Sequence, residues 1–349
     1  MKTLSSGSTG PQVILLQKLL SSVTGQSLAS ATFDPQTLQA VKTFQTNNNL
    51  VSDGIVGERT WNQLLKNAYS FNLQVKNQLL GNGEYMPEVV TKRVIYLHHT
   101  AGRHRPDYTI QAWNSDAPPG EVRRVATAFV IGGQGFDGDT AFDGKTYRAF
   151  NEIYWAHHLG LKHPQNTRLN QQSIAIEICA MGALVKTSAG KYRAAAYPDH
   201  DIFVPESQVH ELETPWRGYQ YFQRYTPKQI DECKRLVLTM SVLFDIPLPN
   251  ITYDTSWFDL KPEALTGAPG LWTHAHVRAD KTDCFPQPEF MAMLNSLHEA
   301  RKTFTVSFDD PRSFHQPAVN DKGLKHLEST VPLSGYSSDL NDVTDTGAP

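Results

Sequence analysis

Residues 94–100 read Val-Ile-Tyr-Leu-His-His-Thr, four apolar residues followed at once by two histidines. An uninterrupted apolar run of this length is typical of a strand that is buried on both faces of a sheet. Similar runs lie at residues 128–131 and 173–178, and residues 227–244 have helical periodicity. The pattern predicts an α/β domain, with a mixed central β-sheet flanked by helices. It also predicts that the first strand delivers His98 to the rim of that sheet.

The N-terminal 67 residues have a different pattern. Apolar residues recur at helical spacing after Pro11, again after Asp34-Pro35, and a third time after Gly57. Proline fits the first turn of a helix, and Asp34 can cap the second helix. We therefore expect residues 1–67 to form a small three-helix all-α domain.

The length of 349 residues also favours more than one domain. Residues 68–91 contain Gly81, Gly83 and Pro87 and are expected to be a linker. A second, larger domain is expected at 92–302, with an aromatic and charged insertion at 184–224 that has no clear periodicity and could form a covering loop. Residues 303–349 are rich in Ser, Asp, Pro and Gly, which predicts a poorly ordered tail.

Bulk properties exclude several classes of protein. The formal net charge is −3, which does not fit the broad basic surface of a nucleic-acid binder. The sequence has no apolar run of about 18 residues that could span a bilayer, and its N-terminus lacks the apolar stretch of a signal peptide. We expect synthesis in the cytoplasm without a signal peptide, and no membrane insertion. Three cysteines make a poor disulfide framework, so free or metal-bound thiols are expected.

Candidate metal ligands occur at two distant places. His98 ends the first predicted strand, and His274-Ala275-His276 is followed by Cys284, eight residues after His276. Two imidazoles and a thiolate suit tetrahedral Zn²⁺, and three protein ligands would leave a fourth position open for catalysis. Spacing alone does not settle the ligand set in a chain with 13 histidines.

Residues 7–61 resemble the peptidoglycan-binding domain 1 family. The matching segments are Gly7-Ser8-Thr9-Gly10, Leu16-Gln17, Phe33-Asp34, Ala40-Val41, Phe44-Gln45, Asp53-Gly54-Ile55-Val56-Gly57 and Thr60-Trp61. The resemblance implies that the domain docks cell-wall glycan or stem peptide in a shallow groove near the Asp-Gly-Ile-Val-Gly turn. The cell-wall-binding residues it implies are Asp53, Gly54, Gly57 and Trp61.

Residues 92–300 resemble the amidase type 2 superfamily of N-acetylmuramoyl-L-alanine amidases. The segments that carry the resemblance are the run that ends in His98-His99-Thr100-Ala101, the strand 128–131, Asp143-Gly144 with Tyr147, Ala156-His157-His158 with Gly160, Ser173–Glu177 and His276–Cys284.

The superfamily implies the metal ligands His98, His276 and Cys284. His99 is rejected as the neighbour of the first ligand, and the eight-residue spacing favours His276 over His274. A rival alignment stays open, because Lys281-Thr282-Asp283 is similar to the Lys-x-Asp ending of the anhydro-muropeptide branch, in which Asp is the third ligand.

The same resemblance implies the other roles. Glu177 is expected to be the acid–base residue, and it lies on the opposite strand face from Ile174, Ile176 and Ile178. Lys281 or Thr282 would stabilise the oxyanion, while His158 and Trp155 would contact substrate. Other branches use a tyrosine on the second strand, but this place reads Thr127-Ala128-Phe129, so Glu177 carries proton transfer here.

The function that follows is zinc-dependent hydrolysis of the amide bond between N-acetylmuramic acid and L-alanine. The alternatives are a non-catalytic peptidoglycan-recognition protein and a peptidoglycan peptidase. Expected partners are the glycan strand and stem peptide and, for an injected antibacterial effector, a secretion machinery or an immunity protein. A phage endolysin is the other expected role. We expect a monomer that acts on the cell wall after release or injection.

Overall fold

The computed structural model describes residues 1–67, 70–71, 75–81, 83–116, 123–304 and 314–315. Three helices, α1 (Pro11–Thr24), α2 (Pro35–Asn47) and α3 (Glu58–Asn67), form the N-terminal region, as predicted. Asp34 caps α2 because its side chain accepts the backbone N–H of Thr37 at 2.7 Å. Leu16, Leu20 and Val41 are completely buried between these helices.

The main sheet has six strands in the order β12-β3-β6-β4-β5-β2. Their bounds are β2 Lys76–Asn77, β3 Val94–His99, β4 Phe129–Ile131, β5 Thr146–Arg148, β6 Ser173–Ile178 and β12 Gly270–Thr273. Only the pairing between β4 and β5 is antiparallel, and β3 and β6 are almost wholly buried, so the predicted mixed α/β sheet is confirmed. Residues 68–91 were expected to be a linker, but part of this segment, β2, pairs with β5 and belongs to the sheet.

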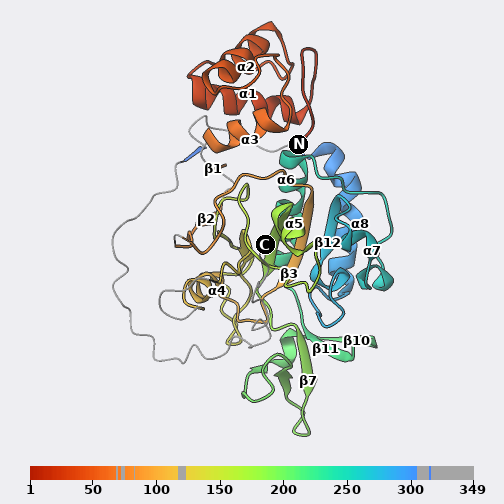
Figure 1. Cartoon of the computed structure of the whole chain (residues 1–349). Coiled ribbons are helices and arrows are strands. Elements are labelled where there is room, and N and C mark those ends of the chain that lie inside the picture. Colours follow the sequence, from red (N-terminus) through yellow and green to blue (C-terminus); the bar gives the residue numbers. More distant parts are fainter. Residues whose placement is uncertain (68–69, 72–74, 82, 117–122, 305–313, 316–349) are drawn as a thin grey trace.

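Helices surround the sheet (Figure 1). Those of the catalytic region are α4 (Pro106–Trp113), α5 (Asn166–Gln171), α6 (Pro227–Phe244), α7 (Pro262–Leu265) and α8 (Pro288–Thr303). The long helix α6 packs on β3, β4 and β6 and against α8. Thr226 caps it in a reciprocal capping box with Gln229. The amide of Gln12 in α1 donates to the carbonyl of Val242 in α6 at 2.6 Å, which ties the N-terminal helices to the catalytic region.

The insertion forms a second sheet rather than an irregular loop. Its strands are β7 (Ala183–Lys186), β8 (Tyr192–Ala194), β9 (Phe203–Val204), β10 (Val209–Trp216) and β11 (Tyr219–Gln223), in the order β10-β11-β7-β8-β9. Every pairing is antiparallel, and a separate apolar cluster of Met181, Leu184, Tyr192, Ala194 and Val204 supports it. Figure 1 shows this sheet at the opposite end of the molecule from α1–α3.

The remaining elements are short. They are β1 (Ser70–Phe71), β13 (Phe314–His315) and the 3₁₀ turns η1 (Glu206–Gln208), η2 (Thr255–Phe258) and η3 (His274–His276). The expectation of a poorly ordered tail falls mainly on residues 305–313 and 316–349, which lie outside the described residues. Within the described part of the chain, no helix combines the length and apolar character needed to cross a membrane.

Candidate metal centre and active site

Three neighbouring parallel strands bring polar residues to one edge of the main sheet. His98 on β3 lies in register with Glu177 on β6, and Leu97 pairs with Thr273, the last residue of β12. The chain then enters η3, so His274 follows β12 at the level at which His98 ends β3. Carboxyl ends of parallel strands are a common place for ligand sites in α/β folds.

His98, His274 and Asp283 form a compact buried group at this edge. The Nδ1 atoms of the two histidines are 3.2 Å apart, and each lies 3.2 Å from Oδ2 of Asp283. All three residues are buried. Asp283 reaches the histidines because the loop after η3 turns back, with the backbone N–H of Ala275 bonded to the carbonyl of Asp283 at 3.0 Å. Among the described residues this is the one group of metal-ligand type that the geometry brings together.

Hydrogen bonds on the far side of His274 fix its tautomer. Its Nε2 lies 2.9 Å from the carbonyl oxygen of Leu159, which can only accept a hydrogen bond. The proton of a neutral His274 therefore sits on Nε2, and the lone pair of Nδ1 faces the group. Burial lowers the pKa of His274, so the neutral ring is favoured even though Asp283 opposes the shift.

A longer relay fixes the tautomer of His98. The hydroxyl of Ser173 donates to the carbonyl of Asn170 at 3.1 Å, so its oxygen accepts from Nε2 of His158 at 2.7 Å. His158 Nδ1 is then an acceptor, and Nε2 of His98 donates to it at 3.0 Å. Burial, followed by the neighbouring His98 and His274, holds the pKa of His158 well below its usual range, which agrees with a neutral ring. His98 therefore also turns the lone pair of Nδ1 toward the group.

Two imidazole nitrogens and a carboxylate oxygen that lie 3.2 Å from one another favour positive charge between them, either a proton or a metal ion. Burial would raise the pKa of Asp283, but His274 and His98, when they carry a proton toward it, outweigh burial and hold that pKa well below the usual range; a metal ion held between the three groups would act in the same direction. Ligands bound at about 2.0–2.1 Å in a tetrahedron lie about 3.3 Å from one another. The donor set and its spacing therefore fit a zinc-sized ion, and outer partners such as Leu159 and His158 are what metal-bound histidines require.

The group differs from the sequence expectation at His276. Nδ1 of His276 accepts the backbone N–H of Thr273 at 2.8 Å, and Nε2 donates to the carbonyl of Trp257 at 2.6 Å. Both ring nitrogens are thus used within the protein, and burial lowers the pKa of His276 to about 4. His276 holds η3 in place, whereas His274, two residues earlier, faces the site.

Cys284 also lies outside the group, and Asp283, the alternative that the sequence left open, takes its place. The thiol is completely buried and hydrogen-bonds with the hydroxyl of Tyr225. Burial, together with the neighbouring Asp283, raises the pKa of Cys284 well above its usual range, so it is held as a thiol. His99 likewise points elsewhere, with Nδ1 3.0 Å from the Tyr225 hydroxyl.

Glu177, the expected acid–base residue, is in register with His98 on the neighbouring strand. Its Oε2 is buried and has no hydrogen-bond partner among the described residues, although the residue as a whole is partly exposed. Burial and the charge of Asp283 raise the pKa of Glu177 well above its usual range, and the charge of Lys281 opposes this shift. Lys281 and Thr282 are both partly exposed on the loop that leads to Asp283.

The two residues expected to contact substrate have other contacts. His158 holds the second nitrogen of His98, as described above. Trp155 is 6% exposed, and its indole N–H donates to a carboxylate oxygen of Glu88 at 3.0 Å. The structure thus places Trp155 in the wall of the domain, where its ring also contacts His157 edge-on.

In the N-terminal region the Asp-Gly turn is well defined, but two of its expected binding residues are internal. Trp61 is 1% exposed and its indole N–H donates to the carbonyl of Lys2, so its role is in the core. Gly54 is buried at φ +77°, and a Cβ there would lie 2.4 Å from the side chain of Leu38. Asp53 is exposed and accepts the N–H of Ile55 at 2.8 Å, while Gly57 is partly exposed. Asp53 and Gly57 thus remain available at the surface.

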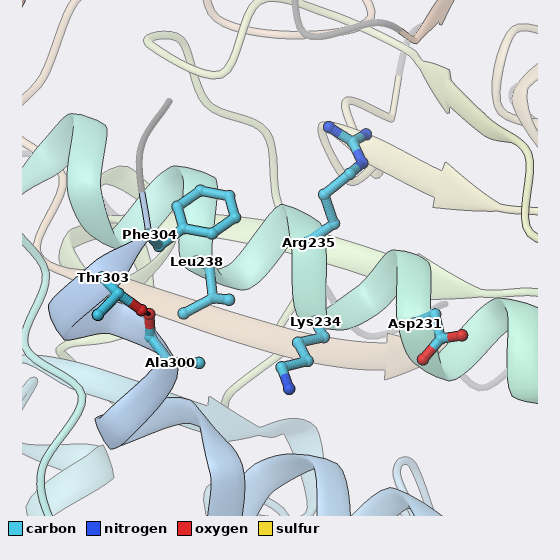
Figure 2. A pocket seen from close by; sticks show the side chains of 7 residues that line it. All are labelled: Asp231, Lys234, Arg235, Leu238, Ala300, Thr303 and Phe304. Carbon is cyan, nitrogen blue, oxygen red and sulfur yellow. Dashed lines mark hydrogen bonds between the residues drawn. The ribbon is translucent and has the colours of Figure 1, made fainter. Parts of the chain in front are cut away.

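A separate depression of about 470 Å³ lies between α6 and α8, and Figure 2 shows its lining. Its lining includes Lys234 and Arg235 of α6 and Thr303 and Phe304 at the end of α8. Arg235 is already paired with Glu232 at 2.7 Å. No residue of the candidate metal group lines this depression, so it is distinct from the reaction centre.

Sequence spacing ranked His274 and Asp283 below their neighbours. A usable signal was nevertheless present, because Gly270–Thr273 is a short strand-like run directly before His274, just as Val94–Leu97 precedes His98. Two such runs, paired in parallel, place the residues that follow them side by side. The exit points of the strands therefore indicate which side chains meet in this group better than the distance between two side chains in the sequence does.

Several solved structures are similar to parts of this chain. PlyL is 13% identical over 64% of this chain and 96% of its own, with a TM-score of 0.34. An AmpD derivative is 13% identical over 63% of this chain and 94% of its own, with a TM-score of 0.35. A periplasmic domain of the EpsAB fusion protein of the Vibrio vulnificus type II secretion system is 31% identical over 18% of this chain, with a TM-score of 0.18, and only 29% of that domain is covered.

Family comparison covers both parts of the molecule. No curated protein matches the chain. Residues 9–64 match a peptidoglycan binding domain, and residues 88–288, more than half of the chain, match the family described as N-acetylmuramoyl-L-alanine amidase. With a buried group that could hold a metal ion inside the second match, this chain belongs to the N-acetylmuramoyl-L-alanine amidase family.

Proposed function

We propose that this protein hydrolyses the amide bond between N-acetylmuramic acid and L-alanine in peptidoglycan, with Zn²⁺ held by His98, His274 and Asp283. The observation that carries the proposal is the triangle of ligand atoms with 3.2 Å edges, in which both histidines present an unprotonated Nδ1. The family match supplies the reaction class. Three protein ligands leave a fourth position open, which is typical of catalytic rather than structural zinc.

The ion, when bound, supplies Lewis-acid activation of water and of the scissile carbonyl. Glu177 is the residue that we assign to proton transfer. It is in register with His98 on the next strand, and its buried Oε2 has no partner among the described residues, so this oxygen is free to accept a proton. Glu177 then returns the proton to the leaving amine of L-alanine.

Lys281 is the residue that we assign to the developing oxyanion, with Thr282 as the second candidate. Lys281 lies two residues before Asp283, is partly exposed, and interacts electrostatically with Glu177. A cation placed beside the reacting carbonyl stabilises charge that appears only in the transition state. Because Lys281 already lies on the loop that leads to Asp283, no rearrangement of the loop is needed during the reaction.

The N-terminal domain would keep the enzyme on its polymeric substrate. The match to a peptidoglycan binding domain supports this role, and Asp53 and Gly57 at the exposed turn are its remaining candidate contacts. Tethering raises the effective concentration of the scissile bond without any new contact at the active site. We propose a monomer that reaches the wall as an endolysin or an injected effector.

Zinc content and product chemistry test the proposal together. Purified protein is expected to contain one zinc ion per chain by mass spectrometry, and digestion of peptidoglycan should release peptides that begin with L-alanine. A folded protein that binds no zinc at micromolar concentration would overturn the metal assignment and leave a binding protein. Products cut within the stem peptide would instead identify a peptidase.

A further inference from the structure

One tight turn of the inserted sheet packs against the loop between His274 and Asp283. Arg217 and Gly218 join β10 to β11, and both have positive φ, +50° and +83°, while the flanking Trp216 and Tyr219 pair with each other. Two central residues with positive φ define a type I′ hairpin turn, whose first position normally holds Asn, Asp or Gly. An arginine in this conformation is strained, so its side chain must gain contacts that offset the strain.

Its hydrogen bonds go to the segment between the proposed zinc ligands His274 and Asp283 and, in one case, to the neighbouring turn η2. Nη1 of Arg217 donates to the carbonyls of Arg278 (2.7 Å), Ala279 (2.9 Å) and Lys281 (2.7 Å). Nη2 donates to Ala275 (2.7 Å) and, more weakly, to Phe258 in η2 (3.3 Å). One guanidinium therefore gathers four carbonyls of residues 275–281. We call this segment the ligand loop.

The bonded carbonyls are close to both ligands. Ala275 directly follows His274, and Lys281 lies two residues before Asp283. The backbone bond between Ala275 and Asp283 closes the base of the loop, and Arg217 fills its centre. Without a cation there, four backbone oxygens would point toward one another, and nothing else in the described residues binds more than one of them.

We infer that Arg217 is a positioning residue that presets the ligand loop for zinc, so that the inserted sheet controls metal affinity. This inference rests on the proposed function for the identity of the metal. Only a planar guanidinium can donate to both groups of carbonyls at once, because it carries N–H groups on separated nitrogens. In the described structure Arg217 makes its hydrogen bonds to backbone carbonyls and none to the ligands, so it acts on them mainly through the backbone, while its charge also interacts with Asp283.

Arg217 also contacts Trp216, which suggests an alternative, purely structural role in docking the inserted sheet. Its guanidinium lies 5.0 Å from the ring centre of Trp216, which packs edge-on against Phe258. If Arg217 only helps to dock the inserted sheet, its loss would lower thermal stability and leave the zinc site unchanged. The two roles are therefore separated by metal affinity rather than by stability.

The test compares Arg217→Ala and Arg217→Lys with Arg193→Ala in the full chain. Arg193 lies on β8 of the same sheet and, among the described residues, makes no hydrogen bond to the ligand loop. Zinc dissociation constants are measured by competition with a chromophoric chelator. Hydrogen exchange of residues 275–281 is measured in zinc-free protein, and the absorption spectrum of the cobalt-substituted protein reports the ligand geometry.

Arg217→Ala is expected to weaken zinc binding by roughly 10- to 100-fold, as loss of an outer partner of a metal site typically does, and to lose exchange protection in the ligand loop. Arg217→Lys should recover part of the affinity, and it supplies the test if the alanine variant does not fold. Arg193→Ala should bind zinc like the parent.

An unchanged zinc constant and unchanged loop protection in both Arg217 variants would overturn the inference while leaving the proposed function intact. A parent protein that binds no zinc would overturn both the proposed function and the inference about zinc. Hydrogen exchange in the zinc-free protein would still report whether Arg217 orders residues 275–281.

Discussion

Two loops of this molecule are each held by one polar side chain that forms several hydrogen bonds. The two side chains differ in how far along the chain they lie from the loop that they hold. In the N-terminal domain, the amide of Gln45 bonds Asp53, Gly54, Ile55 and Thr60, which are 8 to 15 residues away. In the catalytic domain, Arg217 bonds carbonyls that are 41 to 64 residues away.

The difference separates a local from a long-range way of building a site. The turn after α2 is organised within a single small helical domain, so it forms wherever that domain forms. The ligand loop needs the inserted sheet, η2 and the main sheet to be in place together. We therefore expect changes in the first loop to affect docking to the wall, and changes in the second to affect metal and catalysis.

The largest effect on zinc content and hydrolysis is expected from a change at the proposed ligand His274. His274→Ala removes one of three ligand atoms, so zinc should be lost and amide hydrolysis should fall by about a thousand-fold or more, since the metal contributes several kcal/mol to the transition state. His276→Ala is the matched control two residues away, and it should keep zinc while lowering the melting temperature. Metal analysis and product release are the measurements. Zinc retained in His274→Ala and lost in His276→Ala would reverse the assignment.

Glu177→Gln is expected to have the next largest effect. The amide keeps the shape of the side chain but cannot accept the proton, so kcat should fall by roughly 10²- to 10⁴-fold. Zinc content should not change, because Glu177 is outside the ligand triangle. Thr282→Ala, in the same site, provides the control and should cost less. A Glu177→Gln enzyme with parental kcat on peptidoglycan would remove Glu177 from the reaction.

Gln45→Ala addresses the other loop. The buried amide makes four hydrogen bonds. Its removal takes a hydrogen-bond partner from the N–H of Gly54 and from the carbonyl of Ile55, which should lower the free energy of unfolding of the domain by about 1–3 kcal/mol. Cosedimentation with insoluble peptidoglycan should fall, while hydrolysis of a soluble muramyl peptide stays the same. Gln39→Ala, at an exposed position on the same helix, should change neither. Equal loss of activity on the soluble substrate would contradict the separation of the two loops.

The local parts of this fold could be predicted from the sequence. Proline and Asp34 mark the start of α2, and the apolar run 94–97 marks a buried strand, because these signals act over a few residues. The sheet within the insertion could not be predicted, since its strands are short, several of them are partly exposed, and it depends on pairing between β11 and β7 across more than 30 residues.

The candidate site was predicted in part for the same reason. His98 and Glu177 end predicted strands, so their position follows from the pattern. The choice between His274 and His276, and between Asp283 and Cys284, depends on hydrogen bonds to Leu159, Trp257 and Tyr225, which lie far away in sequence. No spacing rule contains these partners.

The smallest change in zinc affinity is expected for a substitution of Cys284. This substitution tests directly whether Asp283 or Cys284 is the third ligand. Cys284→Ala removes a completely buried thiol that bonds the Tyr225 hydroxyl, so stability should fall by about 1 kcal/mol. Zinc affinity should stay within about two-fold of the parent, because the sulfur lies outside the ligand triangle. Asp283→Asn, the adjacent position, should weaken zinc strongly, since the amide cannot supply the negative charge that two neutral imidazoles leave for the third ligand. If Cys284→Ala loses zinc and Asp283→Asn keeps it, the thiolate ligand favoured by spacing is correct and the triangle of His98, His274 and Asp283 is not the metal site.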